Sequence, residues 1–133
     1  TLLASSAASD VYKRQGIICV GLGGGLGAAL RYGISLLPYK GTFPALTLVT
    51  NVLGALVIGV IAGLAARKNL SPNLVLFLKT GVCGGFTTFS TFSLEAYTLI
   101  GKGHYGMAAV YMCASVILCL IGVMGGMYVS EHI

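Results

Sequence analysis

A run of glycine, hydroxyl and aromatic residues, Gly84-Gly85-Phe86-Thr87-Thr88-Phe89-Ser90-Thr91-Phe92-Ser93, interrupts an otherwise apolar segment of this chain. Paired glycines weaken a helix, and a series of hydroxyl groups needs hydrogen-bond partners. Irregular backbone at membrane depth is tolerated only where protein buries it or where it lines a water-filled cavity. Broken helices of this kind surround ions and substrates in membrane proteins. The run therefore predicts a site that binds or moves something small inside a bilayer.

The residues after the glycine pair predict a helix face that joins aromatic rings to a carboxylate. Phe89, Phe92 and Glu95 recur at three-residue intervals, so they share one face. Ionisable side chains in a membrane are costly and are functional candidates, although Glu95 could also be an interfacial carboxylate at a helix end. Arg31 lies near the end of the first apolar segment, where it either snorkels to the headgroups or draws anions into a vestibule.

Two further polar stripes have the spacing of one helical turn. Tyr111, Ser115 and Cys119 recur at four-residue intervals, and Thr47 and Asn51 are also four apart. Aromatic residues at helical spacing are more often packing than function. Here the aromatic stripe continues into a carboxylate, and hydroxyl and amide stripes are available on other helices. This combination favours a narrow polar pathway over a plain lipid-facing surface.

The composition is that of an integral membrane protein. The 133 residues are 56% hydrophobic and 8% charged, with a mean hydropathy of +0.94, whereas a soluble domain carries about 25% charged residues. The net charge of +5 comes from scattered basic residues. Their expected partners are lipid headgroups and an anion, and nucleic acid is not expected.

Neither a disulfide framework nor an enzyme is expected. The cysteines lie in apolar stretches without CxxC spacing, which is typical of small buried side chains in a reduced protein: Cys19, Cys83, Cys113 and Cys119. His104 and His132 fall in a loop and a tail. No set of nucleophile, base and orienting group is visible in the sequence.

Four apolar segments predict an all-α integral membrane protein with four transmembrane helices. They cover residues 16–37, 43–66, 74–100 and 106–129, each near the ~20 residues that cross a bilayer core. The third is expected to break in mid-membrane, and the short connections favour packing of sequential neighbours. Residues 16–133 are expected to form a single channel domain. Residues 1–15 are polar and are interpreted as a non-native or truncated N-terminal segment.

Glycines four residues apart predict close helix packing. The pairs are Gly21/Gly25, Gly23/Gly27, Gly59/Gly63 and Gly122/Gly126. Small residues at this spacing let two helix backbones approach in lipid. The run 23–28 also fits a dinucleotide-binding GxGxxA pattern, but that site requires a preceding strand, which the sequence lacks.

The basic residues are balanced between the two membrane faces when residues 1–15 are left out. Three lie on each side: Arg67, Lys68 and Lys79 on one, and Arg31, Lys40 and Lys102 on the other. Orientation follows the imbalance of Lys and Arg, so a balanced chain can insert both ways. A dual-topology antiparallel homodimer is therefore expected, although a partner homologue of opposite orientation is equally consistent.

Three features together resemble the Fluc (CrcB-type) fluoride channels over about residues 16–129. They are the sequence from Gly84 to Glu95, the pair Thr47 and Asn51 in the second segment, and Arg31-Tyr32 at the end of a glycine-rich first segment. The resemblance implies a dual-topology dimer in the cytoplasmic membrane, with two antiparallel pores that export fluoride passively and confer fluoride resistance.

The same resemblance implies roles for particular residues. Phe89 and Phe92 would be the pore phenylalanines, Asn51 would donate its amide to fluoride, and Arg31 would lie in the vestibule. The remaining polar path would comprise Thr47, Glu95, Tyr111 and Ser115. Hydrogen bonds along this path would replace the hydration shell of a small anion.

The resemblance also implies a structural sodium ion at the dimer centre, held by the backbone carbonyls of Gly84 and Thr87 and their symmetry mates. Two departures from the family pattern are visible. Cys119 stands where family members often carry serine, which affects the far end of the polar path. Ala45-Leu46 replaces a more usual glycine-containing turn ahead of Thr47.

Two other functions compete with a fluoride channel. A small multidrug-type proton-coupled exporter also uses four spans and inverted dimers, but it depends on a carboxylate deep in its first span. From residue 16 on, the first segment has none, and the chain has 0 Trp for stacking on cations. A membrane assembly subunit would explain the glycine packing but not the interrupted third segment.

Overall fold

The computed structural model describes residues 2–133, which are helical except for short connections. Four of its helical stretches are long and apolar enough to cross a membrane, as predicted. The elements are α1 (Leu2–Ser35), α2 (Ala45–Arg67), α3 (Pro72–Val75), η1 (Leu76–Cys83), α4 (Gly84–Phe86), α5 (Phe89–Gly101) and α6 (Tyr105–Glu131). The first helix begins earlier than the predicted residue 16, and its residues 3–15 are exposed.

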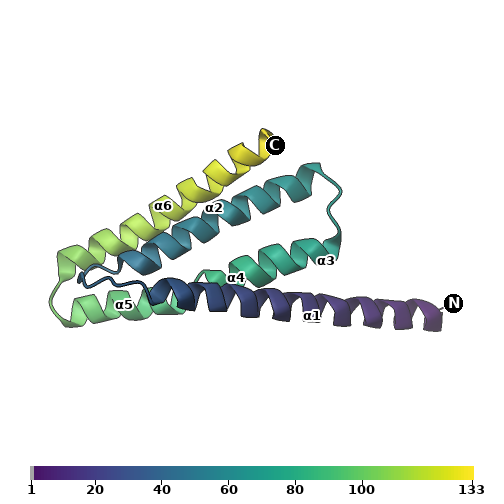
Figure 1. Ribbon diagram of the computed structural model, residues 1–133, viewed down its shortest axis with the longest axis horizontal. Coiled ribbons are helices and arrows are strands. Elements are labelled where there is room, and N and C mark those ends of the chain that lie inside the picture. The colour runs from purple at the N-terminus through teal and green to yellow at the C-terminus, as the bar shows by residue number, and fades with distance from the viewer. Residues whose placement is uncertain (1) are drawn as a thin grey trace.

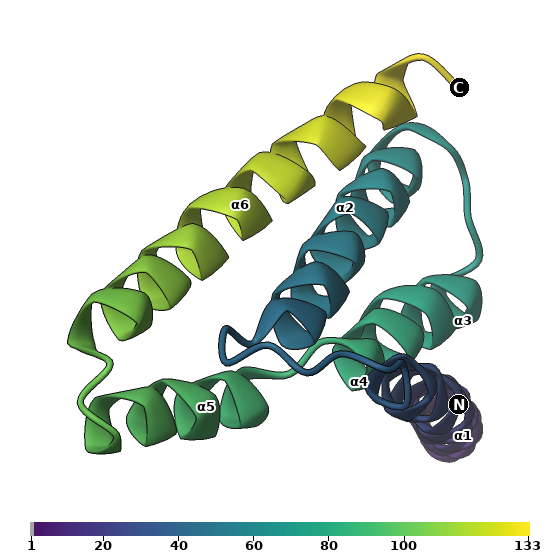
Figure 2. The ribbon, with the colours of Figure 1, turned by 60° about the vertical axis from the view of Figure 1, so that its left-hand side comes forward.

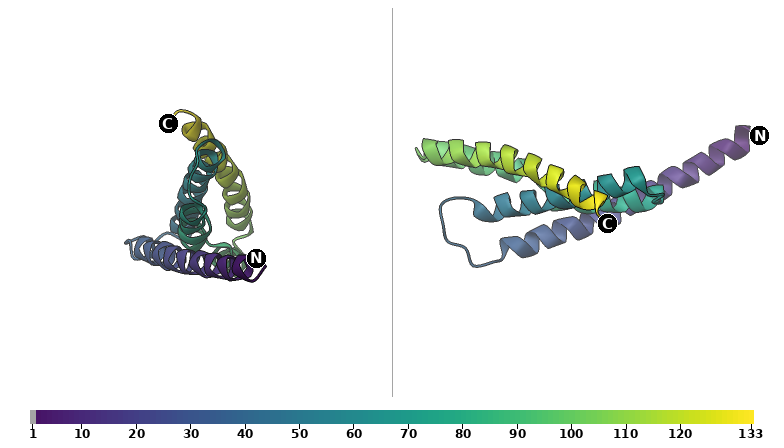
Figure 3. Two further views of the ribbon diagram at one scale, coloured as in Figure 1. Left: turned by 90° about the vertical axis from the view of Figure 1, so that its right-hand side faces the viewer. Right: turned by 90° about the horizontal axis from the view of Figure 1, so that it is seen from above.

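The most extensive helix contacts are not between sequential neighbours, so that prediction is wrong for the main packing, although α5 does contact α6. The most extensive contacts join α2 to α6 and α1 to η1 and α4, whereas α1 and α2 scarcely touch. Figure 1 shows α6 lying along α2, with α1 on the other side beside α4. The left view in Figure 3 shows α2 and α6 side by side, with α1 crossing beneath them. Glycine faces decide these pairings, because close backbone approach is possible only there.

The pairing of α2 with α6 is a contact between backbones. A Cβ atom added to Gly126 would lie 2.1 Å from the Leu56 carbonyl oxygen, and one added to Gly59 would lie 2.4 Å from that of Val123. A Cβ at Gly63 would meet the Ser130 hydroxyl at 1.9 Å. The predicted packing of glycines on these two helices is confirmed.

Only one of the two glycine pairs in α1 packs within the chain. A Cβ at Gly23 would lie 2.3 Å from the Phe77 carbonyl oxygen, and one at Gly27 would lie 2.1 Å from that of Val82. Gly21 and Gly25 have no atom within 4 Å of such a Cβ. Helix α1 therefore turns its 23/27 face toward the third span.

The third span is a composite helix that breaks at two threonines. Its first half continues through the π-helix η1 into α4 and ends at Phe86. Thr87 (φ −82°, ψ 157°) and Thr88 (φ −146°, ψ 124°) are extended, and α5 then leaves in a new direction (Figure 2). Gly84 and Gly85 remain helical, so the break lies after the glycine pair and not at it. β-branched threonine suits extended backbone.

The glycine contact between α2 and α6 yields a first prediction. Gly126→Ala should destabilise the folded chain by about 1–3 kcal/mol, because its methyl group overlaps the α2 backbone and must push the helices apart. Thermal unfolding in detergent measures the change.

Gly125→Ala is the matched control for that substitution. A Cβ at Gly125 would meet no atom closer than 3.7 Å, and alanine favours a helix by up to about 1 kcal/mol over glycine. Equal melting temperatures for the two variants would show that the backbone contact does not hold α2 against α6.

Candidate functional site

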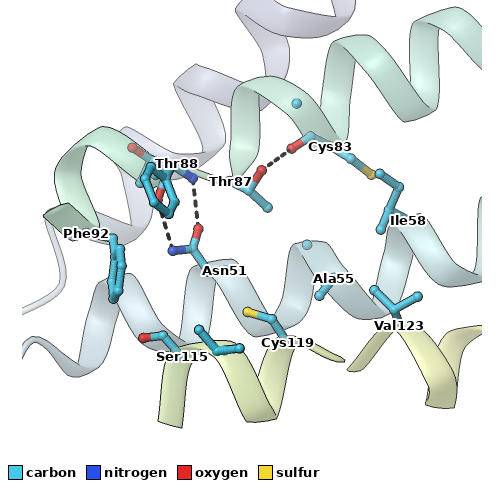
Figure 4. A pocket seen from close by; sticks show the side chains of 14 residues that line it. Asn51, Ala55, Ile58, Cys83, Thr87, Thr88, Phe92, Ser115, Cys119 and Val123 are labelled. Atoms are coloured by element: carbon cyan, nitrogen blue, oxygen red, sulfur yellow. Dashed lines mark hydrogen bonds between the residues drawn. The ribbon is translucent and has the colours of Figure 1, made fainter. Parts of the chain in front are cut away.

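Asn51 of α2 holds the break by two hydrogen bonds to one residue. Its Nδ2 donates to the Thr88 carbonyl oxygen at 3.0 Å, and its Oδ1 accepts from the Thr88 amide nitrogen at 2.8 Å (Figure 4). This pairing replaces the helical partners that the extended backbone gives up. Because an amide nitrogen carries two hydrogens, Asn51 keeps one N–H for another acceptor.

Threonine side chains complete the capping of both half-helices. Thr87 donates from its amide nitrogen (3.0 Å) and its hydroxyl (2.9 Å) to the Cys83 carbonyl oxygen. The Thr88 hydroxyl accepts from the Thr91 amide nitrogen at 3.2 Å as the N-cap of α5. The carbonyl oxygen of Thr87, which lies between the two half-helices, accepts no hydrogen bond within residues 2–133.

Arg31 of α1 reaches the break from the other side. Its Nε donates to the Gly85 carbonyl oxygen at 3.1 Å. The side chain also lines a cavity of about 180 Å³ together with the hydroxyl-bearing residues Thr47, Thr50 and Thr88. Arg31 is therefore a half-buried cation beside hydroxyl groups.

A larger cavity of about 390 Å³ lies between the break, α2 and α6. Its lining includes Asn51, Thr87, Phe89, Phe92 and Ser115 (Figure 4). Ser115 is 7% exposed, and its hydroxyl has no hydrogen-bond partner. A buried hydroxyl without a partner is uncommon, so the cavity offers a donor to a ligand.

Aromatic rings connect this cavity to the carboxylate of Glu95. The ring centroids of Phe89 and Phe92 are 5.6 Å apart, and those of Phe92 and Tyr111 are 5.1 Å apart. Tyr111 is fully buried, and its hydroxyl donates to Glu95 Oε1 at 3.2 Å. The stripe on α5 and the stripe on α6, predicted separately, thus meet at Tyr111.

A third cavity, of about 530 Å³, extends from Glu95 toward the helix ends. Thr47, Glu95 and Lys102 are among its lining residues. Thr47 also lines the cavity beside Arg31, and Thr88 is shared between that cavity and the one beside Phe92. The three cavities are therefore neighbours that share wall residues around the break.

Of the ten predicted site residues, nine line these cavities, and the tenth, Tyr111, contacts Phe92 and Glu95, which do. The ten are Arg31, Thr47, Asn51, Gly84, Thr87, Phe89, Phe92, Glu95, Tyr111 and Ser115. Cys119 also lines the cavity beside Phe92. Sequence reasoning did not assign Thr88 or Gly85, the partners of Asn51 and Arg31. A threonine immediately before a helical run is an N-cap signal that could have singled out Thr88.

Comparison with known proteins gives one family. The profile of the family described as CrcB-like protein, Camphor Resistance (CrcB), matches residues 18–127. A relative from Methylobacterium sp. (strain 4-46), named fluoride-specific ion channel FluC, is 46% identical over 118 residues, which cover 86% of this chain and 95% of the relative. Relatives of the same type from Phocaeicola vulgatus (42% identity, 88% and 99% coverage) and Bacillus subtilis (FluC 2; 43%, 84% and 85%) are similar.

The paired hydrogen bonds of Asn51 yield a second prediction. Asn51→Asp puts an oxygen in place of the Nδ2 donor, so two oxygens would face each other across the bond to Thr88. Amide hydrogen exchange in residues 86–91 should accelerate about fivefold or more, since the lost bond is worth at least about 1 kcal/mol. Mass spectrometry of the protein in detergent measures this exchange.

Asn73→Asp provides the same chemical change away from the break, in α3. Exchange in residues 86–91 should be unaltered in that variant. Unchanged exchange in Asn51→Asp as well would mean that Asn51 does not hold the break.

Proposed function

This chain belongs to the CrcB family, and from that premise we propose that it is a fluoride-selective channel in the cytoplasmic membrane. It lets fluoride leave the cell passively and thereby confers resistance to fluoride. The observation that supports this most is the break at Thr87 and Thr88. There phenylalanine rings, the unpartnered Ser115 hydroxyl and the free Asn51 N–H line a cavity whose described lining residues include no charged side chain, which is an environment for a small anion without a fixed binding charge.

Ring edges at Phe89 and Phe92 supply weak attraction. The edge of an aromatic ring is the positive part of its quadrupole, so a ring edge can face an anion without a formal charge. Conduction requires binding that is favourable and also weak enough for release. Two rings with centroids 5.6 Å apart offer successive positions of this kind.

Hydrogen-bond donors replace the water that fluoride loses. Ser115 has an unpartnered hydroxyl, and Asn51 keeps one amide N–H after bonding Thr88. Both line the cavity beside the two phenylalanines. Thr47, Tyr111 and Glu95 continue the polar path toward the third cavity, and Arg31 lies in the vestibule on the other side of the break.

The working unit is a dual-topology antiparallel homodimer with the break in mid-membrane. Phe89 is 79% exposed in the single chain, although it stands at the break beside the cavity. A second copy would cover this ring and close the cavity. The equal number of basic residues on the two faces supports insertion in both orientations.

A structural sodium ion fits the break better than a transition metal would. Within the described residues, no group of three or more His, Cys, Asp or Glu side chains could hold a metal. The carbonyl oxygen of Thr87 accepts no hydrogen bond in residues 2–133, Gly84 and Thr87 line the same cavity, and hard oxygen ligands suit sodium. A sodium ion held by the Gly84 and Thr87 carbonyl oxygens of both copies would neutralise these carbonyl dipoles and join the two copies.

Fluoride efflux from liposomes tests the function. Protein reconstituted into fluoride-loaded vesicles should release fluoride, measured with a fluoride-selective electrode, only when valinomycin allows potassium to follow. Chloride-loaded vesicles should release no chloride. Absence of fluoride release from correctly folded, reconstituted protein would refute the proposal.

The ring-edge account yields a third prediction. Phe89→Ile and Phe92→Ile should each slow fluoride efflux about two- to tenfold, since an aromatic contact contributes about 0.5–1.5 kcal/mol. Phe77→Ile, in η1 and outside the lining of the three cavities, is the control and should conduct normally. Normal efflux in both pore variants would remove the ring edges from the mechanism.

A further inference from the structure

The end of the first half-helix poses a hydrogen-bonding problem inside the membrane. The last carbonyl groups of a helix have no helical donor, and an unpaired group costs several kcal/mol in hydrocarbon. The Cys83 carbonyl is paired by Thr87. The Gly85 carbonyl receives its hydrogen bond from Arg31 Nε, a residue 54 positions earlier in the chain.

Helix α1 brings Arg31 to this carbonyl along a seam of glycines. Gly23, Gly27 and Arg31 recur at four-residue intervals and therefore share one face of α1. The first two pack against the backbone of η1, and a Cβ at Gly85 would lie 2.3 Å from the Gly24 carbonyl oxygen. Arg31 continues the same face by one turn, to the point where the third span stops being helical.

The two sides of the break are thus held from two different helices. Arg31 of α1 holds Gly85 at the end of the first half-helix, and Asn51 of α2 holds Thr88 at the start of the second. Phe89 follows Thr88 directly, so the place of its ring depends on both contacts. A positive charge near a helix C-terminus also interacts favourably with the negative end of the helix dipole.

We infer that Arg31 is a positioning residue, which acts on conduction through the Nε–H bond to Gly85 and not chiefly by attracting anions with its charge. This inference rests on the proposed function wherever fluoride flux is its readout. The bond fixes the end of α4 relative to α1, and with Asn51 it sets where the aromatic rings stand.

Three substitutions separate the donor from the charge. Arg31→Gln carries its amide nitrogen the same number of bonds from Cα as Nε, so it keeps the donor and loses the charge. Arg31→Lys keeps the charge but has a methylene group at the position of Nε, so it loses that donor. Arg31→Met has neither the donor nor the charge. If Arg31 acts by positioning, fluoride efflux should slow only about threefold in Arg31→Gln. It should slow about thirtyfold in Arg31→Lys and Arg31→Met, which is in the range expected for a lost hydrogen bond to a buried carbonyl.

An anion-attracting role predicts the opposite order. Arg31→Lys would then conduct like the wild type, and the loss in Arg31→Gln would shrink as salt screens the field. That order, or equal losses in Arg31→Gln and Arg31→Lys, would overturn the inference.

Hydrogen exchange of residues 86–91 supplies a readout that does not depend on fluoride. Exchange should accelerate in Arg31→Lys and Arg31→Met and stay near the wild-type rate in Arg31→Gln, with all variants eluting as folded protein. If the wild type released no fluoride, the proposed function would be refuted. The order of exchange rates among the variants would still show whether Arg31 positions the break. Wild-type exchange in Arg31→Lys would overturn that role.

Discussion

The structure depends on one constraint, that backbone polar groups inside a membrane must find partners within the protein. A helix meets the constraint by itself, but Thr87 and Thr88 leave the helix and expose their neighbours' carbonyl and amide groups. Side chains from α1, α2 and the threonines themselves restore most of these bonds. Within the described residues, the Thr87 carbonyl and the Ser115 hydroxyl remain without a hydrogen-bond partner.

The glycine seams serve the same constraint. Polar side chains reach the broken helix because their own helices pack closely against it, and Gly23 and Gly27 bring α1, which carries Arg31, into backbone contact with η1. On the other side, Gly59 and Gly126 hold α2 against α6. In consequence Asn51, Phe92 and Ser115, which come from three helices, line one cavity. The same helix contacts therefore determine both the packing of the chain and the lining of the cavity.

Much of this arrangement was predictable from the sequence. Four apolar segments, the aromatic stripe that ends at Glu95 and the stripe that begins at Tyr111 all follow from length and spacing. The partners of the helices did not follow, because the pairs Gly21/Gly25 and Gly23/Gly27 have identical spacing and only the packed structure distinguishes them. The exact place of the break within the run 84–93 did not follow either, since glycine permits a helix as well as a turn when a neighbouring backbone needs the space. The hydrogen bond from Arg31 to Gly85 joins residues far apart in the chain, so no local sequence pattern predicts it.

The central claim is that the broken helix lines a path that conducts fluoride and rejects chloride. The reversal potential of the protein in a planar bilayer, under a tenfold fluoride gradient with equal chloride on both sides, tests this directly. The account predicts a reversal potential near the fluoride equilibrium value, about 59 mV at 25 °C for one charge, and no shift when a chloride gradient is added. A current that reverses at zero, or one that follows the chloride gradient, would contradict the account.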